Sequence, residues 1–302
     1  MPDLRPMDGI LILDKPGGMT SHDVVVQLRR LLGTEKIGHS GTLDPNATGV
    51  LIGLIGKATK ISRFLMSLGK EYIFTIQLGV ETDTLDKWGK VVMVESCEGV
   101  GPTQILDAAS RFRGRYQQIA PSLSAIKHRG TPLYKLARRG LATPLKTRVV
   151  QITDFQVLDI SMPYVTIRVA CSSGTYVRSL ARDMGRHLGC GASVTSLRRI
   201  TIGSFTIDAA TPLNNLLEGR TSAGDVILSI EKALEHLPKI GLKAASVRSI
   251  RSGRQPCAAD FDGAAMGTDG KYVALTDEAG TIIGIAVRGE HPDAELRTER
   301  IL

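Results

Sequence analysis

The sequence predicts a mixed α+β fold, because strand patterns and helix patterns both occur along its 302 residues. Polar and apolar residues alternate from Glu71 to Leu78, which is typical of a strand with one buried face. Val24, Leu28 and Leu31 recur at the spacing of one face of a helix. Because 42% of the residues are apolar, the chain can fill the core of one large domain, alone or with a small appendage.

The amino-terminal part of the chain predicts a strand, a helix, a second strand and a second helix, in that order. The apolar run from Gly9 to Leu13 is typical of a short strand that ends at a turn-rich corner. Thr20 or Ser21 can cap the helix that follows. Further along, we expect a buried strand over 50–55 and an amphipathic helix over 58–68.

The central part of the chain alternates again between the two kinds of element. We expect a helix over 103–112 and two strands over 151–160 and 164–171. Another helix starts after the turn at Gly174 and ends at Gly189, a residue type that commonly closes helices.

Beyond residue 211 the pattern weakens. Here the sequence predicts short helices over 212–217 and 227–234, and strands over 271–276 and 281–289 that are separated by glycine turns.

Composition and spacing exclude several classes of protein. No apolar run approaches the ~20 residues that span a bilayer, and residues 1–9 lack the pattern of a secretion signal, so we expect a cytoplasmic protein without a membrane span. The four cysteines are far apart, with no histidine at metal-ligand spacing. Residues 53–59, GLIGKAT, have the wrong glycine spacing for a phosphate loop. We therefore predict no nucleotide cofactor and no metal.

The net charge of +8 is concentrated in one part of the chain. Between Ala108 and Thr153 there are ten lysines or arginines and no acidic residue. A solvent-exposed surface normally mixes both signs, whereas a segment of one sign suits a polyanion such as RNA. The alternative is a solvated basic surface that has no partner.

The stretch from Gly38 to Leu51, GHSGTLDPNATGVL, holds the first candidate site residues. Its three glycines favour a shaped loop over a long helix or strand. The loop contains an imidazole, His39, and a carboxylate, Asp44. Pro45 biases Asp44 away from the helical region, so we expect the backbone to aim this carboxylate. The spacing alone also allows another interpretation, in which Asp44 caps a helix that begins at Pro45.

This fourteen-residue string resembles the catalytic loop of the TruB family of tRNA pseudouridine synthases, in which the aspartate is the essential residue. The Gly-His, Thr-Leu-Asp-Pro and Ala-Thr-Gly segments carry the resemblance, while Asn46 stands where many members have an apolar residue. The string DKPGGMTSHDVV, which starts at Asp14, also resembles the amino-terminal motif of the family. This second resemblance implies that Lys15 and Pro16 support the floor of the active site.

Three further strings resemble motifs of the same family, in the right order. KEYIFTIQLGVETDTLDKWGKV, CSSGTYVR and SLRRI occupy 70–91, 171–178 and 196–200. The resemblance assigns roles to Tyr72 (stacking on the target base and candidate proton acceptor), Asp86 (holding an arginine near the site), Tyr176 (lining the uridine pocket), Arg178 (pairing with the catalytic aspartate) and Leu197 (an apolar wall of the pocket). From the residues alone, Tyr72 on the inner face of a strand is also compatible with ordinary core packing.

Arg178, Arg182 and Arg186 lie four residues apart along the helix that follows Gly174. For Arg182 and Arg186 we expect an exposed surface with local ion pairs, as the neighbouring Asp183 indicates. Arg178 differs, because it lies in the first turn beside a strand end, where enzymes built on a sheet place functional side chains.

The resemblance covers roughly 9–200 and implies a stand-alone enzyme that isomerises uridine to pseudouridine in the T-loop of tRNA, at position 55 in tRNA numbering. It implies a largely antiparallel central sheet in a catalytic domain over 1–236, with an RNA-gripping insertion near 121–142. Less specifically, 237–302 resembles a small β-rich PUA-like RNA-binding module. The expected partner is the T-arm of tRNA, bound by a monomer. We expect the target uridine to be extruded from its stack and His39 to fill the vacated place.

Two other functions stay open on the sequence. One is the catalytic subunit of a guide-RNA particle, against which the basic segment at 108–153 argues because it can grip an RNA arm by itself. The other is a non-catalytic RNA binder or RNA-folding helper that uses the same cleft.

Overall fold

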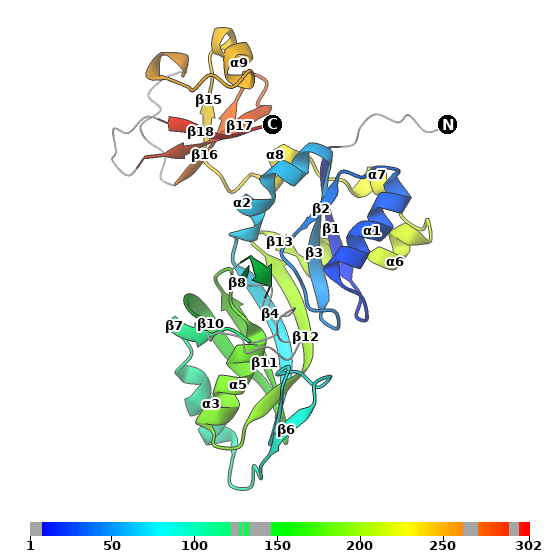
Figure 1. Ribbon diagram of the computed structural model, residues 1–302, viewed down its shortest axis with the longest axis vertical. Helices are drawn as coiled ribbons and strands as arrows, with labels where there is room; N and C mark the ends of the chain where they lie inside the picture. The colour runs from blue at the N-terminus through cyan, green and yellow to red at the C-terminus, as the bar shows by residue number, and fades with distance from the viewer. Residues whose placement is uncertain (1–7, 122–126, 129, 133–145, 262–270, 290–295) are drawn as a thin grey trace.

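A ten-stranded sheet forms the framework of the protein, as a computed structural model of the chain shows (Figure 1). The structure describes residues 8–121, 127–128, 130–132, 146–261, 271–289 and 296–302. The strands of this sheet are β1 (Gly9–Lys15), β2 (Ile37–Ser40), β3 (Thr48–Ile55), β4 (Lys70–Leu78), β7 (Gly114–Ile119), β10 (Thr147–Ser161), β11 (Tyr164–Cys171), β12 (Ala192–Ile202), β13 (Phe205–Thr206) and β14 (Thr211–Pro212). Their order is β14-β1-β3-β12-β4-β11-β10-β7, with β2 paired to β3 and β13 paired to β12.

The pairing in this sheet is mixed and mainly antiparallel, which confirms the predicted fold class. Only the β1–β14 and β3–β12 pairs are parallel among the described strands of this sheet. The β3–β12 pair is short, with Thr48 opposite Arg198 and Gly49 opposite Arg199. We call this pair the seam, because it joins an amino-terminal half (β14, β1, β3 and β2) to a central half (β12, β13, β4, β11, β10 and β7).

The amino-terminal half of the sheet is covered by helices on both faces. On one face lie α1 (Ser21–Leu32) and α6 (Leu213–Leu217), which share an apolar cluster with β1 and β3. On the other face lie the 3₁₀ helix η1 (Gly56–Ile61), α2 (Ser62–Met66) and α8 (Ile230–Ala233). Helix α1 begins at a capping box formed by Thr20 and Asp23 and ends at Gly33, as its sequence signals predict.

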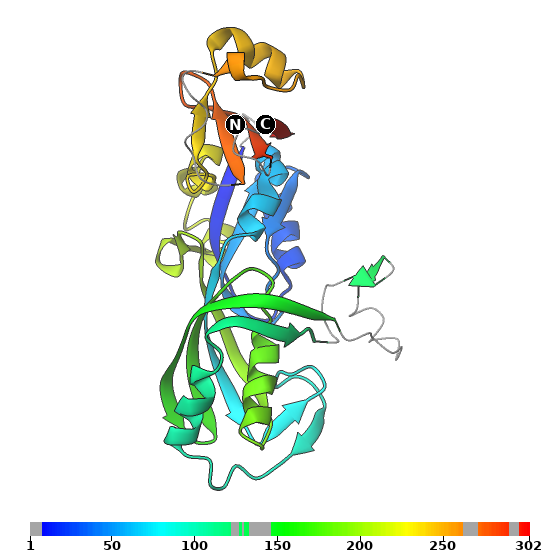
Figure 2. The same ribbon diagram turned by 90° about the vertical axis from the view of Figure 1, so that its left-hand side faces the viewer.

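The central half carries its two helices on one face of a curved sheet (Figure 2). These are α3 (Pro102–Ser110) and α5 (Val177–His187). Their buried residues pack with those of β4, β10, β11 and β12 in one cluster, which also contains Leu43 and Ala47 from the loop between β2 and β3. The loop that carries Asp44 is therefore fastened into the core of the central half, although it belongs to strands of the amino-terminal half.

The remaining elements form smaller units. They are β5 (Val80–Thr82) with β6 (Val91–Val94), β8 (Lys127–His128) with β9 (Thr131–Pro132), η2 (Ile207–Ala209) and α7 (Ala223–Val226). The carboxy-terminal segment contains β15 (Lys239–Gly241), α9 (Ala244–Arg251), η3 (Ala258–Asp260), β16 (Tyr272–Thr276), β17 (Ile282–Arg288) and β18 (Leu296–Ile301). Its strands form a separate four-stranded sheet in the order β15-β16-β17-β18.

This four-stranded sheet packs against the amino-terminal half of the large sheet. Ala274, Ile282 and Ile285 belong to the same apolar cluster as η1 and α2. Arg63 of α2 pairs with Glu299 of β18, and Lys60 Nζ donates to the Ile301 carbonyl at 3.0 Å. The strands expected over 271–276 and 281–289 thus form, and they lie in a sheet of their own.

Several elements differ from those expected. The helix expected over 58–68 is split into η1 and α2, because Gly56, with φ 58°, turns the chain sharply out of β3 and Thr59 Oγ1 donates to its carbonyl. The helix expected over 227–234 is shorter and covers only α8. The ends of the Gly38–Leu51 stretch belong to β2 and β3, so the irregular loop is only 41–47. The insertion expected near 121–142 lies mostly outside the described residues.

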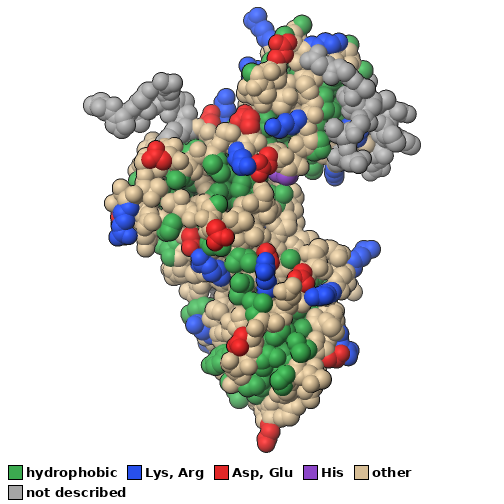
Figure 3. Space-filling model, turned by 180° about the vertical axis from the view of Figure 1, so that it is seen from behind, with side chains coloured by type: hydrophobic (Ala, Val, Ile, Leu, Met, Phe, Trp, Pro, Cys, Tyr) green, Lys and Arg blue, Asp and Glu red, His purple; other side chains and the backbone are tan. Residues whose placement is uncertain are grey.

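No helix among the residues that the structure describes is both long and apolar enough to span a bilayer. On the face seen from behind, basic and acidic side chains are interspersed among the described residues, and hydrophobic side chains gather over the central half (Figure 3). The described residues on that face therefore form no large patch of one charge.

Candidate active site

The loop at 41–47 holds the Asp44 carboxylate at the seam. Leu43 and Ala47 are 3% and 2% exposed, and Ser21 Oγ both accepts from the Leu43 N–H at 2.9 Å and donates to the Leu43 carbonyl at 3.2 Å. Asp44 lies between these two anchors, and its side chain stays 38% exposed. The chain continues from Asp44 into a turn and then into β3, so the interpretation of Asp44 as a helix cap is wrong.

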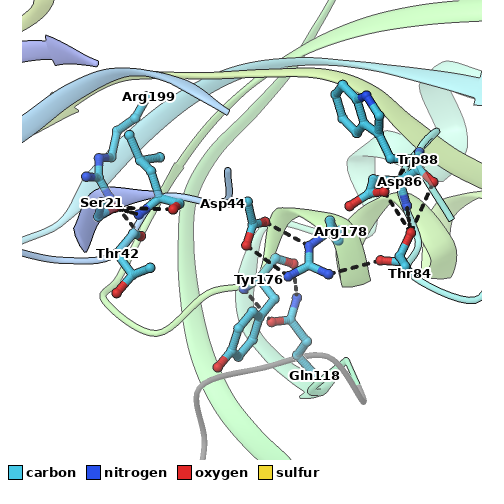
Figure 4. Close-up of polar contacts among 11 residues, drawn as sticks. Ser21, Thr42, Asp44, Thr84, Asp86, Trp88, Gln118, Tyr176, Arg178 and Arg199 are labelled. Atoms are coloured by element: carbon cyan, nitrogen blue, oxygen red, sulfur yellow. Dashed lines mark hydrogen bonds and ion pairs between the residues drawn. The ribbon is translucent and has the colours of Figure 1, made fainter. Parts of the chain in front are cut away.

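Arg178 approaches Asp44 from the first turn of α5. Its Nε lies 2.8 Å from Oδ2 of Asp44 and its Nη2 lies 3.1 Å from Oδ1, which is a bidentate ion pair (Figure 4). The Arg178 side chain is only 8% exposed, and its Nη1 donates to the Thr84 carbonyl at 3.0 Å. A guanidinium with a fixed plane and permanent charge both orients the carboxylate and compensates its negative charge.

The loop between β5 and β6 binds Arg178 on the side of the guanidinium that does not face Asp44. Thr84 Oγ1 donates to Asp86 Oδ1 at 2.7 Å, while the Thr84 carbonyl accepts from Arg178. Asp86 is thus linked to the arginine through Thr84. Leu85, between them, has φ 64° and is the non-glycine residue with positive φ in the described chain. A buried leucine in this region is strained, and such strain is characteristic of loops that hold functional groups.

Tyr72 and Arg199 lie next to each other on the paired strands β4 and β12. Tyr72 is on the inner face of β4 and 9% exposed, and it lies opposite Arg199 in the pairing of these strands. Arg199 is 1% exposed. It donates from Nε to the Val50 carbonyl at 2.7 Å, from Nη2 to Gly41 at 3.1 Å and from Nη1 to Thr42 at 3.5 Å.

Burial and charge act in opposite directions on these two groups. Burial raises the pKa of the Tyr72 hydroxyl, and the adjacent Arg199 guanidinium counteracts part of that rise. Burial likewise lowers the pKa of Arg199, while Tyr72 opposes the change. The phenol is therefore neutral at ordinary pH and lies in the field of a buried cation.

Tyr176 caps α5 and is fixed by a side chain that the sequence did not single out. Gln118, fully buried on β7, accepts from the Tyr176 N–H at 2.8 Å and donates to its carbonyl at 3.0 Å. The Tyr176 ring stays partly exposed, with the Arg148 guanidinium 5.9 Å from its centroid. Leu197, on β12, is partly buried against the core of the central half.

Lys15 and His39 occupy the floor around the loop. Lys15 is fully buried, and its Nζ donates to the carbonyls of Pro16, Met19 and Pro45 at 2.7, 2.8 and 3.0 Å. Burial lowers the Lys15 pKa to about 8, although the Asp44 charge acts to raise it.

His39 lies on β2, partly buried, and its Nδ1 has no hydrogen-bond partner among the described residues. Burial lowers its pKa, and Arg199 lowers it further. This imidazole is therefore a neutral ring with one uncommitted nitrogen.

The structure thus brings Asp44 and Arg178 into contact from distant parts of the chain, and it links Asp86 to Arg178 and Lys15 to the Asp44 loop. It adds three residues that sequence reasoning missed: Thr84, Gln118 and Arg199. Thr84 and Arg199 lie inside strings that were recognised, yet nothing in their local spacing reveals what they contact. Gln118 meets Tyr176 at a separation of 58 residues, which no local pattern encodes.

The expectation for Arg182 is wrong in one respect. Its side chain is 9% exposed, because it lies between α5 and β7 and donates to the Ile119 carbonyl at 3.2 Å as well as to Asp183. Arg186 is exposed as expected, but its partner is the buried Glu81 of β5, at 2.6 Å, and not a neighbour on the helix.

The fold and the family that the sequence matches place the chain in the class of pseudouridine synthases. The structure is similar to a chain of an H/ACA ribonucleoprotein bound to a substrate RNA containing 2'-deoxyuridine, with TM-score 0.71, 26% identity and coverage of 97% of this chain and 84% of that one. It is also similar to a chain of the archaeal box H/ACA Nop10–Cbf5 complex, with TM-score 0.72, 25% identity and coverage of 99% and 87%.

Within this class, the chain belongs to the TruB family. The model of the TruB family pseudouridylate synthase N-terminal domain matches residues 29–177, and that of the tRNA pseudouridylate synthase B C-terminal domain matches 178–235. A tRNA pseudouridine synthase B of Geobacter sulfurreducens is 42% identical, over 90% of this chain and 93% of the relative. The protein of the same name from Oleidesulfovibrio alaskensis is 40% identical, over 94% and 92%.

Proposed function

We propose that this protein is a stand-alone cytoplasmic isomerase that converts uridine to pseudouridine in the T-loop of tRNA, at position 55. The observation that carries the proposal is the bidentate Asp44–Arg178 pair, in which the carboxylate is 38% exposed while the guanidinium is buried. Membership of the TruB family and the names of the relatives support the same reaction.

The reaction breaks the bond between the ribose carbon and the base nitrogen, turns the base and rejoins it through carbon. No electrons or phosphoryl groups are exchanged, so the protein must supply a carboxylate, a proton acceptor and walls that retain the free base. Asp44 is the carboxylate: either attack on the ribose carbon or removal of a neighbouring proton requires its ionised form. Arg178 compensates the charge of the carboxylate and orients both of its oxygens.

Tyr72 is the proposed acceptor of the hydrogen that the new carbon–carbon bond displaces. Because the phenol is neutral, it accepts this proton only as its own hydroxyl proton passes to another group, for which the base nitrogen freed by the cleavage is available. The nearby Arg199 guanidinium favours this ionisation of the phenol. Tyr176 and Leu197 are the proposed walls, and Lys15 supports the loop from below through the Pro45 carbonyl.

The substrate uridine must leave its stack to reach Asp44, which costs a few kcal/mol of stacking. His39 is the residue that we propose fills the vacated stack, since its ring is neutral and Nδ1 is uncommitted. The basic segment at 108–153, the proposed insertion near 121–142 and a PUA-like module over 237–302 would hold the T-arm, beside a catalytic domain over 1–236. We expect a monomer that needs neither a nucleotide cofactor nor a metal.

A second candidate function is that of the catalytic subunit of a guide-RNA particle. The structural similarity to chains of H/ACA ribonucleoproteins favours it. Under that function the isolated chain would lack the RNA that selects the target.

The experiment that separates the candidates uses the purified full chain with an unmodified T-arm hairpin. Pseudouridine forms at one uridine if the enzyme is stand-alone, and Asp44→Asn abolishes it while the hairpin still binds. Product that requires an added guide RNA would favour the particle subunit. Binding without product under either condition would favour a non-catalytic RNA binder and contradict the proposal.

A further inference from the structure

Trp88 is the only tryptophan of the chain, and it is 50% exposed. It lies in the loop between β5 and β6, within the segment that supports Arg178. A tryptophan is usually mostly buried, because its ring is the largest apolar surface of any side chain. This ring is instead presented to solvent close to the proposed catalytic carboxylate.

The loop holds Trp88 rigidly without any partner molecule. The Asp86 carboxylate accepts from the Trp88 N–H at 3.1 Å as well as from Thr84. On the two sides, Lys87 N–H donates to the Val194 carbonyl at 2.9 Å, and Val194 N–H donates to the Leu85 carbonyl at 3.0 Å. An aromatic ring on such an ordered loop loses little entropy when it meets a ligand.

A continuous chain of contacts connects Trp88 to the reacting carboxylate. It runs from the Trp88 N–H through Asp86 and Thr84 to Arg178, and from Arg178 to Asp44. Figure 4 shows the indole beyond Asp86, directed away from the Asp44–Arg178 pair. The ring is therefore placed to meet a group next to the target nucleotide and not the target base itself.

The chemistry around the ring matches a nucleotide. Lys87 Nζ lies 4.8 Å from the centroid of the indole, so a positive charge accompanies the flat apolar face. A base can stack on the indole while its phosphate meets the ammonium group.

We propose that Trp88 is a stacking platform for an unpaired base that flanks the target uridine of the RNA substrate. The proposal rests on the proposed function, since it assumes an RNA in the Asp44 site. It adds a contact that selects substrates whose flanking nucleotide is free to stack.

The test uses the intrinsic fluorescence of the full chain, which comes from Trp88 alone among indoles. Titration with the unmodified T-arm hairpin should quench this emission, and a hairpin with an abasic site beside the target uridine should quench it much less. Trp88→Ala should weaken hairpin binding by about tenfold or more, while Trp88→Phe should recover most of the affinity. Leu106→Ala is the matched control, since Leu106 is 53% exposed on α3, and it should leave binding unchanged.

The outcomes separate this proposal from the proposed function. Unquenched emission together with unchanged affinity in Trp88→Ala overturns the stacking role, even when the wild-type chain forms pseudouridine. Quenching and weakened binding in a chain that forms no pseudouridine would retain the stacking role and contradict the proposed function.

An independent observation concerns Arg199, the largest side chain that is fully buried. The hydrogen-bond partners that the structure gives this cation among the described residues are three backbone carbonyls, with no carboxylate. Burying an unpaired guanidinium is costly, so its placement requires a compensating benefit.

The contacts of Arg199 join the two sides of the seam. Its donors hold Gly41 and Thr42, at the start of the loop that carries Asp44, and Val50 on β3. Arg199 also lies opposite Tyr72 in the pairing of β12 with β4, both strands of the central half. One planar guanidinium thus binds the loop that carries Asp44 and lies beside the phenol.

We infer that Arg199 is a positioning residue that sets the place of Asp44 relative to Tyr72 and keeps its own positive charge next to the phenol. This inference also rests on the proposed function. Arg199→Lys keeps the charge but not the fork, so it should slow the single-turnover reaction about a hundredfold while hairpin affinity stays within about threefold.

A double-mutant cycle with Tyr72→Phe distinguishes this role from a merely structural one. In the Tyr72→Phe background, Arg199→Lys should slow the remaining reaction by less than tenfold, because the phenol hydroxyl beside the guanidinium is already absent. Equal factors in both backgrounds would overturn the inference. If Arg199→Lys does not fold, amide exchange at Leu43 in Tyr72→Phe replaces it: faster exchange than in the wild type supports the positioning role, and unchanged exchange overturns it.

Discussion

Two aspartate–arginine pairs in this protein have the same chemistry and opposite surroundings. Asp260, in the carboxy-terminal segment, accepts from Arg254 at 2.6 and 3.0 Å, from Ser246 Oγ at 2.6 Å and from the Cys257 N–H at 2.7 Å, and its side chain is 7% exposed. Asp44 accepts from Arg178 at 2.8 and 3.1 Å, and its side chain is 38% exposed.

The two carboxylates differ in how much of their hydrogen-bond acceptor capacity is still unoccupied. Asp260 is saturated: Arg254, and then Ser246 and Cys257, hold its pKa well below the usual range, and no ligand can reach it without breaking these bonds. Asp44 is oriented along one edge only and keeps lone pairs open to solvent. A saturated pair stabilises a fold, whereas a half-open pair can react.

The largest expected effect separates the two aspartates by activity. Asp44→Asn should lower the rate of pseudouridine formation more than about a thousandfold, because the amide can neither attack carbon nor accept a proton. Asp260→Asn should leave the rate on the same hairpin unchanged. Single-turnover assays on both variants check this, and residual activity near the wild-type level in Asp44→Asn would contradict the role of Asp44.

The two arginines should differ in the same way. Arg178→Ala should slow turnover by about 10² to 10³-fold, since the remaining carboxylate loses its orientation and its compensating charge. RNA affinity should stay largely intact, as measured by hairpin binding. Arg254→Ala is the matched control and should alter stability alone. A near-wild-type single-turnover rate in Arg178→Ala would refute the positioning of Asp44 by this residue.

For the free energy of unfolding, we expect the opposite order, with a larger loss in Asp260→Asn than in Asp44→Asn. Asp260→Asn should reduce the free energy of unfolding by about 2 kcal/mol, because hydrogen bonds to a buried charge are weakened. Asp44→Asn should change it by less, since its carboxylate is partly solvated. Urea denaturation of both variants measures the difference, and a larger loss for Asp44→Asn would reverse the comparison.

The smallest expected effect is the pH dependence of the stabilisation that Asp260 gives to the free energy of unfolding. The pKa of Asp260 is lower in the folded than in the unfolded state. Its contribution to the free energy of unfolding is therefore fully present above about pH 4. As the pH falls towards the folded-state pKa, this contribution should fade by at most about 1.4 kcal/mol per pH unit. The gap between wild type and Asp260→Asn in urea denaturation should therefore narrow below pH 4, and a constant gap down to pH 2 would exclude the mechanism.

The sequence predicts those parts of the candidate site whose elements follow from local residue patterns. Alternation and helical spacing gave β4, β11 and α5, and with them the elements on which Tyr72 and Arg178 stand. It could not reach Arg199 or Gln118, because their roles depend on backbone carbonyls and amides that only the folded chain brings near.

The same limit explains the errors. Arg182 follows the spacing of an exposed helix face, yet β7 happens to cover it. The positive φ of Leu85 likewise goes with a distant contact, since the Leu85 carbonyl accepts from the Val194 N–H. Periodicity reports which face of an element is apolar, and it does not report which other element lies against that face.

Gly49 lies in the seam, where β3 and β12 are so close that a side chain does not fit. A methyl group built there would lie 2.1 Å from the carbonyl oxygen of Arg199, and the residue has φ 103°. Any side chain at this point would push β3 away from β12 and strain the loop that carries Asp44, because this loop is anchored to both halves of the sheet. The lack of a side chain at Gly49 thus sets the spacing of the two halves that the loop joins.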